Sequence, residues 1–346
     1  MSRVLIATGG TGGHLLPAQA VGEALQAMGS EVLLTGHGLL ENRCFYRKLP
    51  FQVIRAAPLR ARYFFRDCAV LGSGLVQALW CVRSFAPDLV VGFGSFHTAP
   101  VLAAAKLCRR PIALVESNAV PGRVNRFFSR WADLVALSIP DASACVRGAP
   151  CFVRLPERAK ERVGAAIARR YFGLDPEALT LLVFGGSLGA MEINRNIVDA
   201  VCASGLEFQV IHLTGNEEMI PFVQGCYAKR GVRACVKSFE DQMSLAWESA
   251  DCALCRAGGG TVAEIVEFAV PSLLLPYPYA SDDHQRKNAE YIERLGGGVS
   301  LSGIGDVAAE LAVLPGRLAG MRQALIRAKE DARFQPLITA LGSLLF

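Results

Sequence analysis

A histidine follows a glycine-rich turn near the start of the chain, and together they suit chemistry on an anionic substrate. The turn reads Gly9-Gly-Thr-Gly-Gly-His14, with four glycines in five residues. Its uncovered backbone N–H groups lie near the positive end of a predicted helix and suit an anion, and an imidazole can act as a general base near neutral pH. A simple strand-to-helix turn needs only one glycine, so we favour an anion site. The spacing matches neither the Gly-x-Gly-x-x-Gly fingerprint nor a P-loop.

Two polar segments of the second half have residue types that recognise a phosphate and a sugar. Arg256-Ala-Gly-Gly-Gly-Thr-Val-Ala-Glu264 opens a helix, whose first turn would place the Thr261 hydroxyl near a phosphate. Glu264, about one turn further on, suits the hydroxyls of a ribose, and it fits equally well an acid stabilised by the helix dipole. Three polar side chains near the start of a later helix suit sugar hydroxyls, or a solvated and capped helix end: His284, Gln285 and Asn288.

In the first half, candidate site residues follow three predicted strands. His14, Phe96 and Asn118 each come shortly after such a strand. The carboxyl ends of parallel strands meet at one edge of a sheet, so we expect these residues to converge. Metal-dependent phosphosugar chemistry is disfavoured, because no Asp-x-Asp follows a strand and the histidines do not cluster in the sequence. Cys252-Ala-Leu-Cys255 lies in a strand-like run without a second pair, so a zinc site is not expected there.

Aromatic residues and arginines alternate before a long apolar helix. Tyr63, Phe64, Phe65 and Arg66 suit an anionic bilayer surface, although single-stranded nucleic acid or a buried aromatic cluster would fit the same pattern. Residues 1–155 carry 17 basic and 8 acidic side chains, a net charge of +9. Residues 156–346 carry 19 and 23, a net charge of −4. This asymmetry favours an anionic partner for the first half, or is ordinary surface charge.

Bulk composition excludes several classes of protein. The chain has 346 residues, of which 52% are hydrophobic and 19% charged, as expected for a globular protein with room for two domains. We expect no signal peptide, because Met1-Ser-Arg leads straight into a strand. The longest apolar stretch, Cys68–Val82, is too short to span a bilayer. The eleven cysteines are scattered through the predicted elements, which favours reduced thiols over disulfides.

The elements that position these groups alternate between strands and helices, which is typical of an α/β fold with parallel sheets. In the first half we expect strands near 3–8, 31–35, 51–55, 88–92, 111–115 and 133–137, and helices near 15–28, 38–48, 67–85, 98–108 and 122–131. A charged linker at 151–170 precedes a second copy of the pattern, with strands near 179–184, 207–213, 232–236, 251–255, 271–275 and 298–301. A second glycine turn, Gly185-Gly-Ser-Leu-Gly189, follows the first of these strands. The sequence therefore predicts two Rossmann-like domains with both glycine turns lining a cleft, and a last helical stretch, 317–333, that could pack on either domain.

These motifs together resemble the bacterial glycosyltransferases of peptidoglycan synthesis, in glycosyltransferase family 28. Further marks are Gly92-Phe-Gly-Ser-Phe96, Glu116-Ser-Asn118, Phe239-Glu-Asp-Gln-Met243 and Asp283-His-Gln-Arg-Lys-Asn-Ala289. The family transfers N-acetylglucosamine from UDP-N-acetylglucosamine to the muramyl 4-hydroxyl of undecaprenyl-pyrophosphoryl-muramyl-pentapeptide (lipid I), with inversion, to give lipid II. The resemblance thus implies a role in cell-wall synthesis, cell shape and cell division.

The resemblance implies an α/β fold of the GT-B class, with two Rossmann-like domains facing across a cleft. Residues 1–155 would form the domain that faces acceptor and membrane, with a C-terminal helix at about 331–346 packed back onto it, and 156–330 would bind the donor. The implied partners are UDP-N-acetylglucosamine, lipid I, the anionic inner-membrane surface and other cell-wall enzymes. No cofactor, metal or nucleic acid is implied, and the expected location is peripheral, on the cytoplasmic face of the inner membrane.

The resemblance also implies roles for individual residues. His14, Asn118 and Glu264 would be catalytic, with His14 as the base. The Glu240 backbone would contact uracil, Glu264 the ribose, Ser187 and the Thr261 region the diphosphate, and Gln285 with His284 the sugar. The full set implied to contact the donor is Thr11, Gly12, Gly13, Asn118, Arg158, Ser187, Glu240, Gly259, Gly260, Thr261, Val262, Ala263, Glu264, His284 and Gln285. Tyr63, Phe64, Phe65 and Arg66 would face the membrane.

Three positions depart from the family pattern. Leu155-Pro-Glu-Arg158 lacks the usual asparagine of the linker, Phe96 replaces a tyrosine, and Val115-Glu-Ser-Asn118 replaces His-Glu-Gln-Asn. These changes concern the hinge and the acceptor side. Two alternatives therefore stay open: another GT-B enzyme with a different acceptor, and a nucleotide- or nucleic-acid-binding protein without catalysis.

Overall fold

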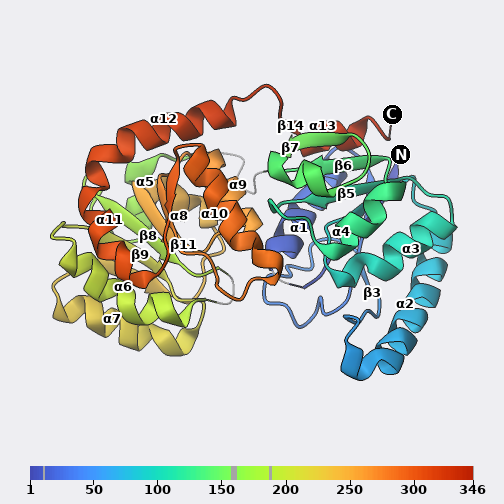
Figure 1. Cartoon of the computed structure of the whole chain (residues 1–346), viewed down its shortest axis with the longest axis horizontal. Coiled ribbons are helices and arrows are strands. Elements are labelled where there is room, and N and C mark those ends of the chain that lie inside the picture. The colour runs from blue at the N-terminus through green and yellow to red at the C-terminus, as the bar shows by residue number, and fades with distance from the viewer. Residues whose placement is uncertain (11, 157–161, 187–188, 346) are drawn as a thin grey trace. The chain divides into compact units, whose positions relative to one another are not determined.

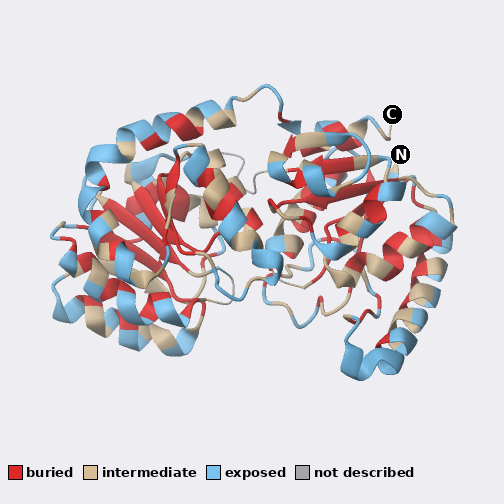
Figure 2. Ribbon diagram, in the orientation of Figure 1, coloured by how far each residue is buried: buried red, intermediate tan, exposed pale blue. Residues whose placement is uncertain are grey.

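The chain folds into two compact units (Figure 1). The computed structural model describes residues 1–10, 12–156, 162–186 and 189–345. The first unit comprises Met1–Glu157 with Ala332–Phe346, and the second comprises Arg158–Asp331. In each unit a fully parallel sheet carries helices on its faces, and Figure 2 shows that the strands are the most buried part of both units. Strands buried on both faces read as continuous apolar runs, which is why they were readable in the sequence.

The sheet of the first unit has eight strands in the order β14-β7-β6-β5-β4-β1-β2-β3. Their bounds are β1 Arg3–Ala7, β2 Glu31–Gly36, β3 Phe51–Val53, β4 Leu89–Gly92, β5 Ile112–Glu116, β6 Leu134–Leu137, β7 Pro150–Arg154 and β14 Gln335–Pro336. The strand order reverses between β1 and β4, which are hydrogen-bonded neighbours. In a doubly wound sheet, ligands bind beyond the carboxyl ends of the strands at this reversal.

Helices of the first unit cover the sheet and build its core. They are α1 Gly12–Ala27, α2 Phe64–Phe85, α3 Ala99–Leu107, α4 Arg123–Phe128 and α13 Leu337–Gly342. Apolar side chains of α2 and α3, such as Ala78, Val82 and Leu102, pack with Leu5 and Val90 of the sheet.

The helix expected at 38–48 is not present, and that prediction is wrong. Side chains satisfy the backbone of this segment instead: Asn42 Oδ1 accepts from Cys44 N (2.9 Å), and Gln19 Nε2 donates to the Cys44 carbonyl oxygen (2.8 Å). Asn42 Nδ2 also donates to the carbonyl oxygen of Gly10 (2.6 Å). The segment is therefore an ordered loop that supports the first glycine turn.

Helix α2 is longer than the apolar stretch in the sequence. With a short 3-10 turn before it, the helical segment Ala61–Phe85 has 25 residues and is long and apolar enough to cross a membrane by length and composition. The expectation that this region is too short for a span was therefore wrong. One face of the helix is tied to the first unit, since Ala78, Cys81 and Val82 are fully buried in its core.

The sheet of the second unit has six strands in the order β10-β9-β8-β11-β12-β13. Their bounds are β8 Thr180–Phe184, β9 Gln209–Leu213, β10 Ala234–Lys237, β11 Cys252–Cys255, β12 Ser272–Leu274 and β13 Gly298–Ser300. Here the order reverses between the paired strands β8 and β11. The second unit thus repeats the topology that surrounds the reversal in the first.

Eight helices lie in the described part of the second unit. They are α5 Ala165–Tyr171, α6 Met191–Ala203, α7 Ile220–Lys229, α8 Met243–Ser249, α9 Gly259–Phe268, α10 His284–Arg294, α11 Val307–Val313 and α12 Leu318–Lys329. The last of these packs on this unit, since Lys329 Nζ donates to the Glu267 carbonyl oxygen (2.9 Å) and Arg322 Nη2 to that of Asp251 (3.2 Å).

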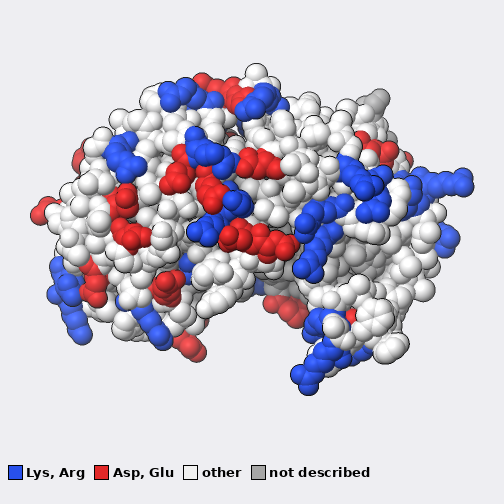
Figure 3. Space-filling model, in the orientation of Figure 1, with Lys and Arg blue, Asp and Glu red and all other residues white. Residues whose placement is uncertain are grey.

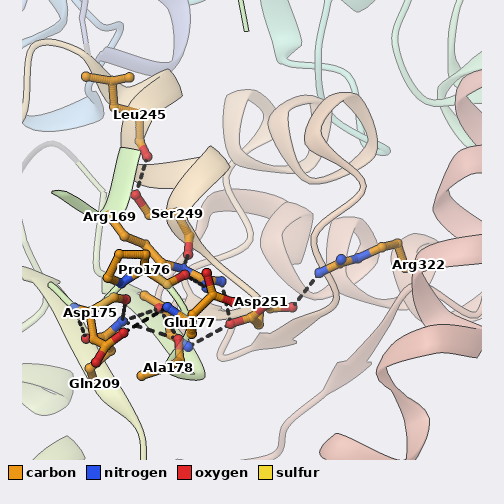
Figure 4. A network of polar contacts seen from close by, with 11 residues as sticks. Arg169, Asp175, Pro176, Glu177, Ala178, Gln209, Leu245, Ser249, Asp251 and Arg322 are labelled. Carbon is orange, nitrogen blue, oxygen red and sulfur yellow. Dashed lines mark hydrogen bonds and ion pairs between the residues drawn. The ribbon is translucent and has the colours of Figure 1, made fainter. Parts of the chain in front are cut away.

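A polar network ties together the ends of β8, β9 and β11 that lie away from the glycine turns (Figure 4). Arg169 Nη2 donates to Asp251 Oδ2 (2.8 Å), which also accepts from Thr180 N (2.8 Å). Gln209 Nε2 donates to the Thr180 hydroxyl (2.9 Å) and to the Asp175 carbonyl oxygen (2.7 Å). This network fixes the amino ends of the strands whose carboxyl ends carry candidate site residues.

The segments at the unit boundaries contain more structure than the sequence indicated. The expected linker at 151–170 includes most of β7 and part of α5. After α12 the chain returns to the first unit, where Gln335 pairs with Val153 and the short strand β14 extends the sheet. Helix α13 follows, with Leu337, Ala340 and Leu341 buried.

Candidate functional site

The first glycine turn packs against the loop that follows β4. Gly9 has a φ of +146°, and a Cβ there would lie 2.8 Å from the Cβ of His97 and 3.0 Å from the carbonyl oxygen of His37. Gly10 has a φ of +82°, and a Cβ there would lie 3.1 Å from Cε1 of the His97 ring. Close packing and backbone conformation therefore both require glycine here. The loops after β1 and β4 meet where the strand order reverses.

His97 is the central side chain of this contact, and sequence reasoning missed it because its role depends on residues far away in the chain. Its Nδ1 is hydrogen-bonded to the Ser95 hydroxyl (2.7 Å), and its ring stacks on Phe96 with 3.8 Å between centroids. Burial lowers the pKa of His97 to about 4, with further lowering by the charges of His37 and His14. His97 is therefore neutral at pH 7.

The loop around His97 has a strained backbone. Ser95 has a φ of +65° and a ψ of 156°, a region that is costly for any residue except glycine. Strain of this kind is concentrated at functional sites, because only a surrounding structure that enforces it can maintain it. The strained residue lies next to Gly94, whose φ is +76°.

Gly94 lies close both to His14 and to Asn125, which follows β5 in the chain. A Cβ at Gly94 would lie 3.6 Å from Cε1 of His14 and 3.1 Å from Nδ2 of Asn125. His14 is half-buried in the first turn of α1. The loop after β4 therefore lies beside both His14 of α1 and Asn125 of α4. The convergence of His14, Phe96 and Asn118 themselves stays a prediction.

The buried carboxylate of Glu116 organises the loop that carries Asn118. Glu116 Oε1 accepts from both the backbone N (3.0 Å) and Nδ2 (2.9 Å) of Asn118. Its Oε2 accepts from Gly122 N (2.9 Å) and Asn125 Nδ2 (3.0 Å). Four donors satisfy this carboxylate, so Asn118 is held in one position at the end of β5.

The second glycine turn leads from β8 into α6. A Cβ at Gly185 would lie 2.4 Å from the backbone N of Ala190, and one at Gly189 would lie 2.2 Å from the Thr214 carbonyl oxygen. Gly189 also has a φ of +74°. Glycine is required at both positions, and the turn lies at the reversal point of the second sheet.

Helix α9 begins directly beyond the neighbouring strand β11. Its N-cap is Gly258, and no side chain of the described residues caps that end. Gly259, Gly260 and Thr261 form its first turn, where backbone N–H groups and a hydroxyl suit a phosphate. Arg256 fixes the preceding loop, with Nη1 donating to the carbonyl oxygens of Leu275 and Pro276 (3.0 Å each).

Glu264 is the sixth residue of α9 and lies beyond its first turn. The interpretation of Glu264 as a first-turn acid stabilised by the helix dipole is therefore wrong, since that effect fades within one turn. Instead its Oε2 accepts a hydrogen bond from the indole Nε1 of Trp247 (3.0 Å). The sequence contained no local signal for this contact, because Trp247 comes from α8.

Comparison with known proteins gives the family. A model of the glycosyltransferase family 28 N-terminal domain matches residues 4–137, and one of the C-terminal domain matches residues 180–303. The chain belongs to glycosyltransferase family 28. It is therefore a glycosyltransferase, and the expectation of an enzyme is confirmed.

Similar curated proteins carry one name, UDP-N-acetylglucosamine–N-acetylmuramyl-(pentapeptide) pyrophosphoryl-undecaprenol N-acetylglucosamine transferase. The Protochlamydia amoebophila protein is 39% identical over 310 residues, which cover 86% of this chain and 82% of that protein. The Desulfotalea psychrophila protein is 37% identical over 307 residues, covering 85% and 82%. The Desulforudis audaxviator protein is 33% identical over 351 residues, covering 93% of each. The resemblance stated from sequence motifs is thus confirmed.

Solved structures give the same result for the fold. The crystal structure of Acinetobacter baumannii MurG matches with a TM-score of 0.75 and 25% identity, covering 100% of this chain and 99% of that one. The glycosyltransferase SnogD from Streptomyces nogalater matches with a TM-score of 0.72 over 100% of both chains, but at 18% identity it supports the fold alone. The predicted pair of parallel-sheet, Rossmann-like domains of the GT-B class is confirmed.

In this family 28 enzyme the side chain of Glu240 is fully engaged within its own unit. Its buried carboxylate accepts from Lys237 Nζ (2.6 Å) and from Gln242 N (2.9 Å). Burial works to lower the pKa of Lys237, but the hydrogen bond and charge of Glu240 outweigh it and raise that pKa. The Glu240 carboxylate is therefore committed to contacts within the second unit.

The residues expected to contact the sugar lie at the start of α10. His284 Nδ1 is hydrogen-bonded to the Ser281 carbonyl oxygen (2.8 Å), and Gln285 Oε1 accepts from Tyr277 N (2.9 Å). Asn288 is different: it is fully buried and its Nδ2 donates to the Ala257 carbonyl oxygen (2.9 Å). The sequence-based interpretation of Asn288 as a sugar contact is replaced by a role in holding the loop before α9.

The remaining residues that the resemblance assigns to the donor differ in how far the structure describes them. Thr11, Arg158 and Ser187 lie outside the described residues. Gly12 is buried, Gly13 is exposed, and Ala263 is half-buried. Val262 is buried and its N–H donates to the Gly258 carbonyl oxygen (3.0 Å).

Among the described residues, no group of three or more His, Cys, Asp or Glu side chains is placed to hold a metal.

Proposed function

We propose that this glycosyltransferase transfers N-acetylglucosamine from UDP-N-acetylglucosamine to the muramyl 4-hydroxyl of undecaprenyl-pyrophosphoryl-MurNAc-pentapeptide. The observation that carries the proposal is the shared name of relatives that are 33–39% identical and match over 82% or more of their own length. The anion-suited turns at the two sheet reversals support it, because the donor is a pyrophosphate and the acceptor carries one.

The reaction is a single displacement with inversion. The 4-hydroxyl oxygen forms a bond to the anomeric carbon, and the bond from that carbon to the UDP oxygen breaks, so UDP leaves with the electron pair. The proton of the hydroxyl passes to His14, whose half-buried imidazole lies at the start of α1. Asn118, held by Glu116, positions the acceptor beside His14.

The second unit binds the donor. The N–H groups and hydroxyl at the start of α9 hold the diphosphate and stabilise the charge on departing UDP, with Arg158 and Ser187 adding to them. Glu264 accepts from the ribose hydroxyls, the Glu240 backbone contacts uracil, and Gln285 with His284 contacts the sugar. The resemblance adds Thr11, Gly12 and Gly13 of the first unit to the residues assigned to the donor.

The first unit faces the membrane, where the lipid acceptor resides. Its helix α2 exposes Phe65 (88%), Trp80 (67%) and Phe64 (52%) on the side away from the core, with Tyr63 beside them. Arg66 lies in the same first turn of α2, and Figure 3 shows Lys and Arg side chains gathered near the start of this helix. Exposed aromatic rings surrounded by cationic side chains suit an anionic lipid surface. We therefore place the enzyme peripherally on the inner membrane. The resemblance adds the cytoplasmic face of that membrane and the presence of other cell-wall enzymes beside it.

One assay tests the proposed reaction. Transfer from UDP-N-acetylglucosamine to a lipid I analogue is measured with and without EDTA, alongside a panel of other hydroxyl acceptors. We expect transfer to the lipid I analogue at equal rates in both conditions, because helix ends and cationic side chains take the place of a metal. A preference for another acceptor would reject the assigned substrate, and loss of activity in EDTA would reject the metal-free mechanism.

A further inference from the structure

Trp247 is buried at the centre of an aromatic cluster in the second unit. Only 1% of its surface is exposed. Its ring lies edge-on to Phe184 at the end of β8, with 5.5 Å between centroids and an interplanar angle of 89°. Phe268 at the end of α9 stacks on it, with 6.1 Å between centroids and an angle of 21°. These two contacts fix both the position of the indole and the direction of its N–H.

That N–H is aimed at the candidate ribose-binding carboxylate. Trp247 Nε1 donates to Glu264 Oε2 at 3.0 Å, so a buried, donor-only group meets a charged acceptor. A glutamate has three side-chain torsions, and ordering them costs free energy each time a ligand binds. The indole removes that cost by holding the carboxylate in one orientation. Each carboxylate oxygen can accept more than one hydrogen bond, so the indole does not by itself prevent a hydrogen bond from a ligand.

We infer that Trp247 is a positioning residue that orients Glu264 for the ribose and makes the site select ribonucleotides over 2′-deoxyribonucleotides. The inference rests on the proposed function, because it requires a nucleoside diphosphate at α9. A diol donates to an oriented carboxylate through both hydroxyls, whereas a 2′-deoxy sugar leaves one acceptor position unpaired. Trp247 touches neither the sugar nor the reacting atoms and acts only through Glu264.

Nucleotide affinity tests the inference in the full-length enzyme. UDP and 2′-deoxy-UDP are titrated calorimetrically into the wild type and into Trp247→Phe, which keeps an aromatic ring but lacks the N–H. We expect the variant to bind UDP about five- to tenfold more weakly, as for loss of one hydrogen bond. The loss for 2′-deoxy-UDP should be clearly smaller, because only its 3′-hydroxyl donates to the carboxylate. Equal weakening of both nucleotides, or of neither, would overturn the inference.

Two further variants of the enzyme distinguish the orientation of Glu264 by Trp247 from the packing of the Trp247 ring. Benzothienylalanine at position 247 keeps the shape of the indole and replaces its N–H with sulfur, so it reports on the hydrogen bond even if the phenylalanine variant folds poorly. The matched control is Tyr227→Phe, which removes another buried aromatic donor of the same unit, the one hydrogen-bonded to His212 (3.2 Å). We expect the first to lose the preference for UDP and the second to retain it. The reverse pattern would contradict the inference.

The test also separates this inference from the proposed function. A wild type that transfers sugar from UDP-N-acetylglucosamine but binds UDP and 2′-deoxy-UDP equally would overturn the role of Trp247 and leave the function standing. A wild type that binds neither nucleotide would overturn both. In a Glu264→Ala background, Trp247→Phe should cause no additional loss of UDP affinity, because a positioning residue has nothing left to position.

Discussion

At the scale of single residues, the histidines of this enzyme have different roles that follow from their surroundings. His14 is half-buried at the start of a helix and close to Gly94 of a strained loop. His97 lies beneath the glycine turn and is neutral at pH 7. His212 is fully buried between Asn194 and Tyr227 in the second unit. His212 is enclosed in the core, whereas half-buried His14 lies at the start of α1, at the end of the first glycine turn, where a substrate can reach its imidazole.

Replacing His14 with alanine should therefore affect the chemical step and leave nucleotide binding intact. We expect kcat to fall by about 10²–10⁴-fold, the usual contribution of a general base, while the Kd for UDP stays within about twofold of the wild-type value. Steady-state kinetics and calorimetry measure the two quantities. An enzyme that turns over at the parental rate would show that His14 is structural.

The buried histidines should make the stability of the enzyme depend on pH. Burial lowers the pKa of His97 to about 4 and that of His212 to about 3, so both bind protons more weakly in the folded chain than in the unfolded one. The stabilisation is complete above pH 6.5 and is lost as the pH falls toward 4. For His212 the loss between pH 7 and pH 5 should be about 2 kcal/mol, and for the partly exposed His97 it should be smaller.

Urea unfolding at pH 7 and pH 5 measures this effect. His212→Gln should be less stable than the wild type at pH 7 but should lose less stability on acidification, because glutamine does not titrate. His284→Gln is the control, since that side chain is only half-buried and lies at the start of α10. Equal pH dependence in the wild type and His212→Gln would contradict the assignment.

At the scale of elements, α2 is both the largest exposed apolar helix of the first unit and a firmly docked one. A Cβ at Gly74 would lie only 1.9 Å from the Arg55 carbonyl oxygen, so glycine permits close approach of the helix to the chain after β3. Gly72, on the same helix, has no neighbouring atom within 4 Å of such a Cβ. The two glycines form a matched pair for testing how the helix is held.

Gly74→Ala and Gly72→Ala should have opposite effects on stability. We expect Gly74→Ala to destabilise the enzyme by about 2 kcal/mol or more, because a fixed backbone atom must move. Gly72→Ala should stabilise it by up to about 1 kcal/mol through helix propensity. Urea unfolding of both variants provides the measurement, and similar effects of the two substitutions would show that α2 is not docked as described.

The exposed face of α2 should bind anionic vesicles. Replacing Phe64 and Phe65 together with serine should weaken flotation with such vesicles by about tenfold or more, since each ring contributes apolar area to the bilayer interface. Phe222→Ser is the matched control, because Phe222 is 48% exposed on α7 of the second unit. Unchanged flotation of the double variant, or an equal loss for Phe222→Ser, would count against α2 as the membrane contact.

At the scale of the whole molecule, the first unit is completed by the last residues of the chain. Arg154 Nη1 donates to the Phe334 carbonyl oxygen (2.6 Å), and the rings of Phe152 and Phe334 lie 5.7 Å apart. Leu337 and Leu341 of α13 are fully buried. The stability of the first unit therefore depends on a segment that is made after the whole second unit.

Leu337→Ala should reveal this dependence. We expect it to destabilise the first unit by about 2–5 kcal/mol, as for other leucines truncated in a packed core, although position 337 follows the whole second unit in the chain. Val313→Ala, at a position that is 54% exposed, should change stability by less than about 0.5 kcal/mol. Hydrogen exchange assigns the destabilisation to a unit, and faster exchange confined to the second unit would contradict the prediction.

The sequence by itself determined the features that are encoded locally. Both sheets were readable because parallel strands buried on two faces appear as short apolar runs, and the motifs at Gly9–His14 and Arg256–Glu264 were readable because each is one continuous turn. The same local signals identified the family. A local pattern at 38–48 was misleading, because Gln19 and Asn42 satisfy the backbone there and compete with a helix.

Only the tertiary structure decided which distant residues complete these local motifs. His97 packs under Gly9 and Gly10, Asn125 donates to Glu116, Asn288 holds the loop before α9, and Trp247 orients Glu264. In the last two cases the partners come from different elements of the second unit, so no spacing along the chain reveals them. Hydrogen bonds and close packing act through space, and the sheet order that brings these side chains together is fixed only when the whole unit has folded. The sequence thus specified which groups are available, and the fold specified which of them act together.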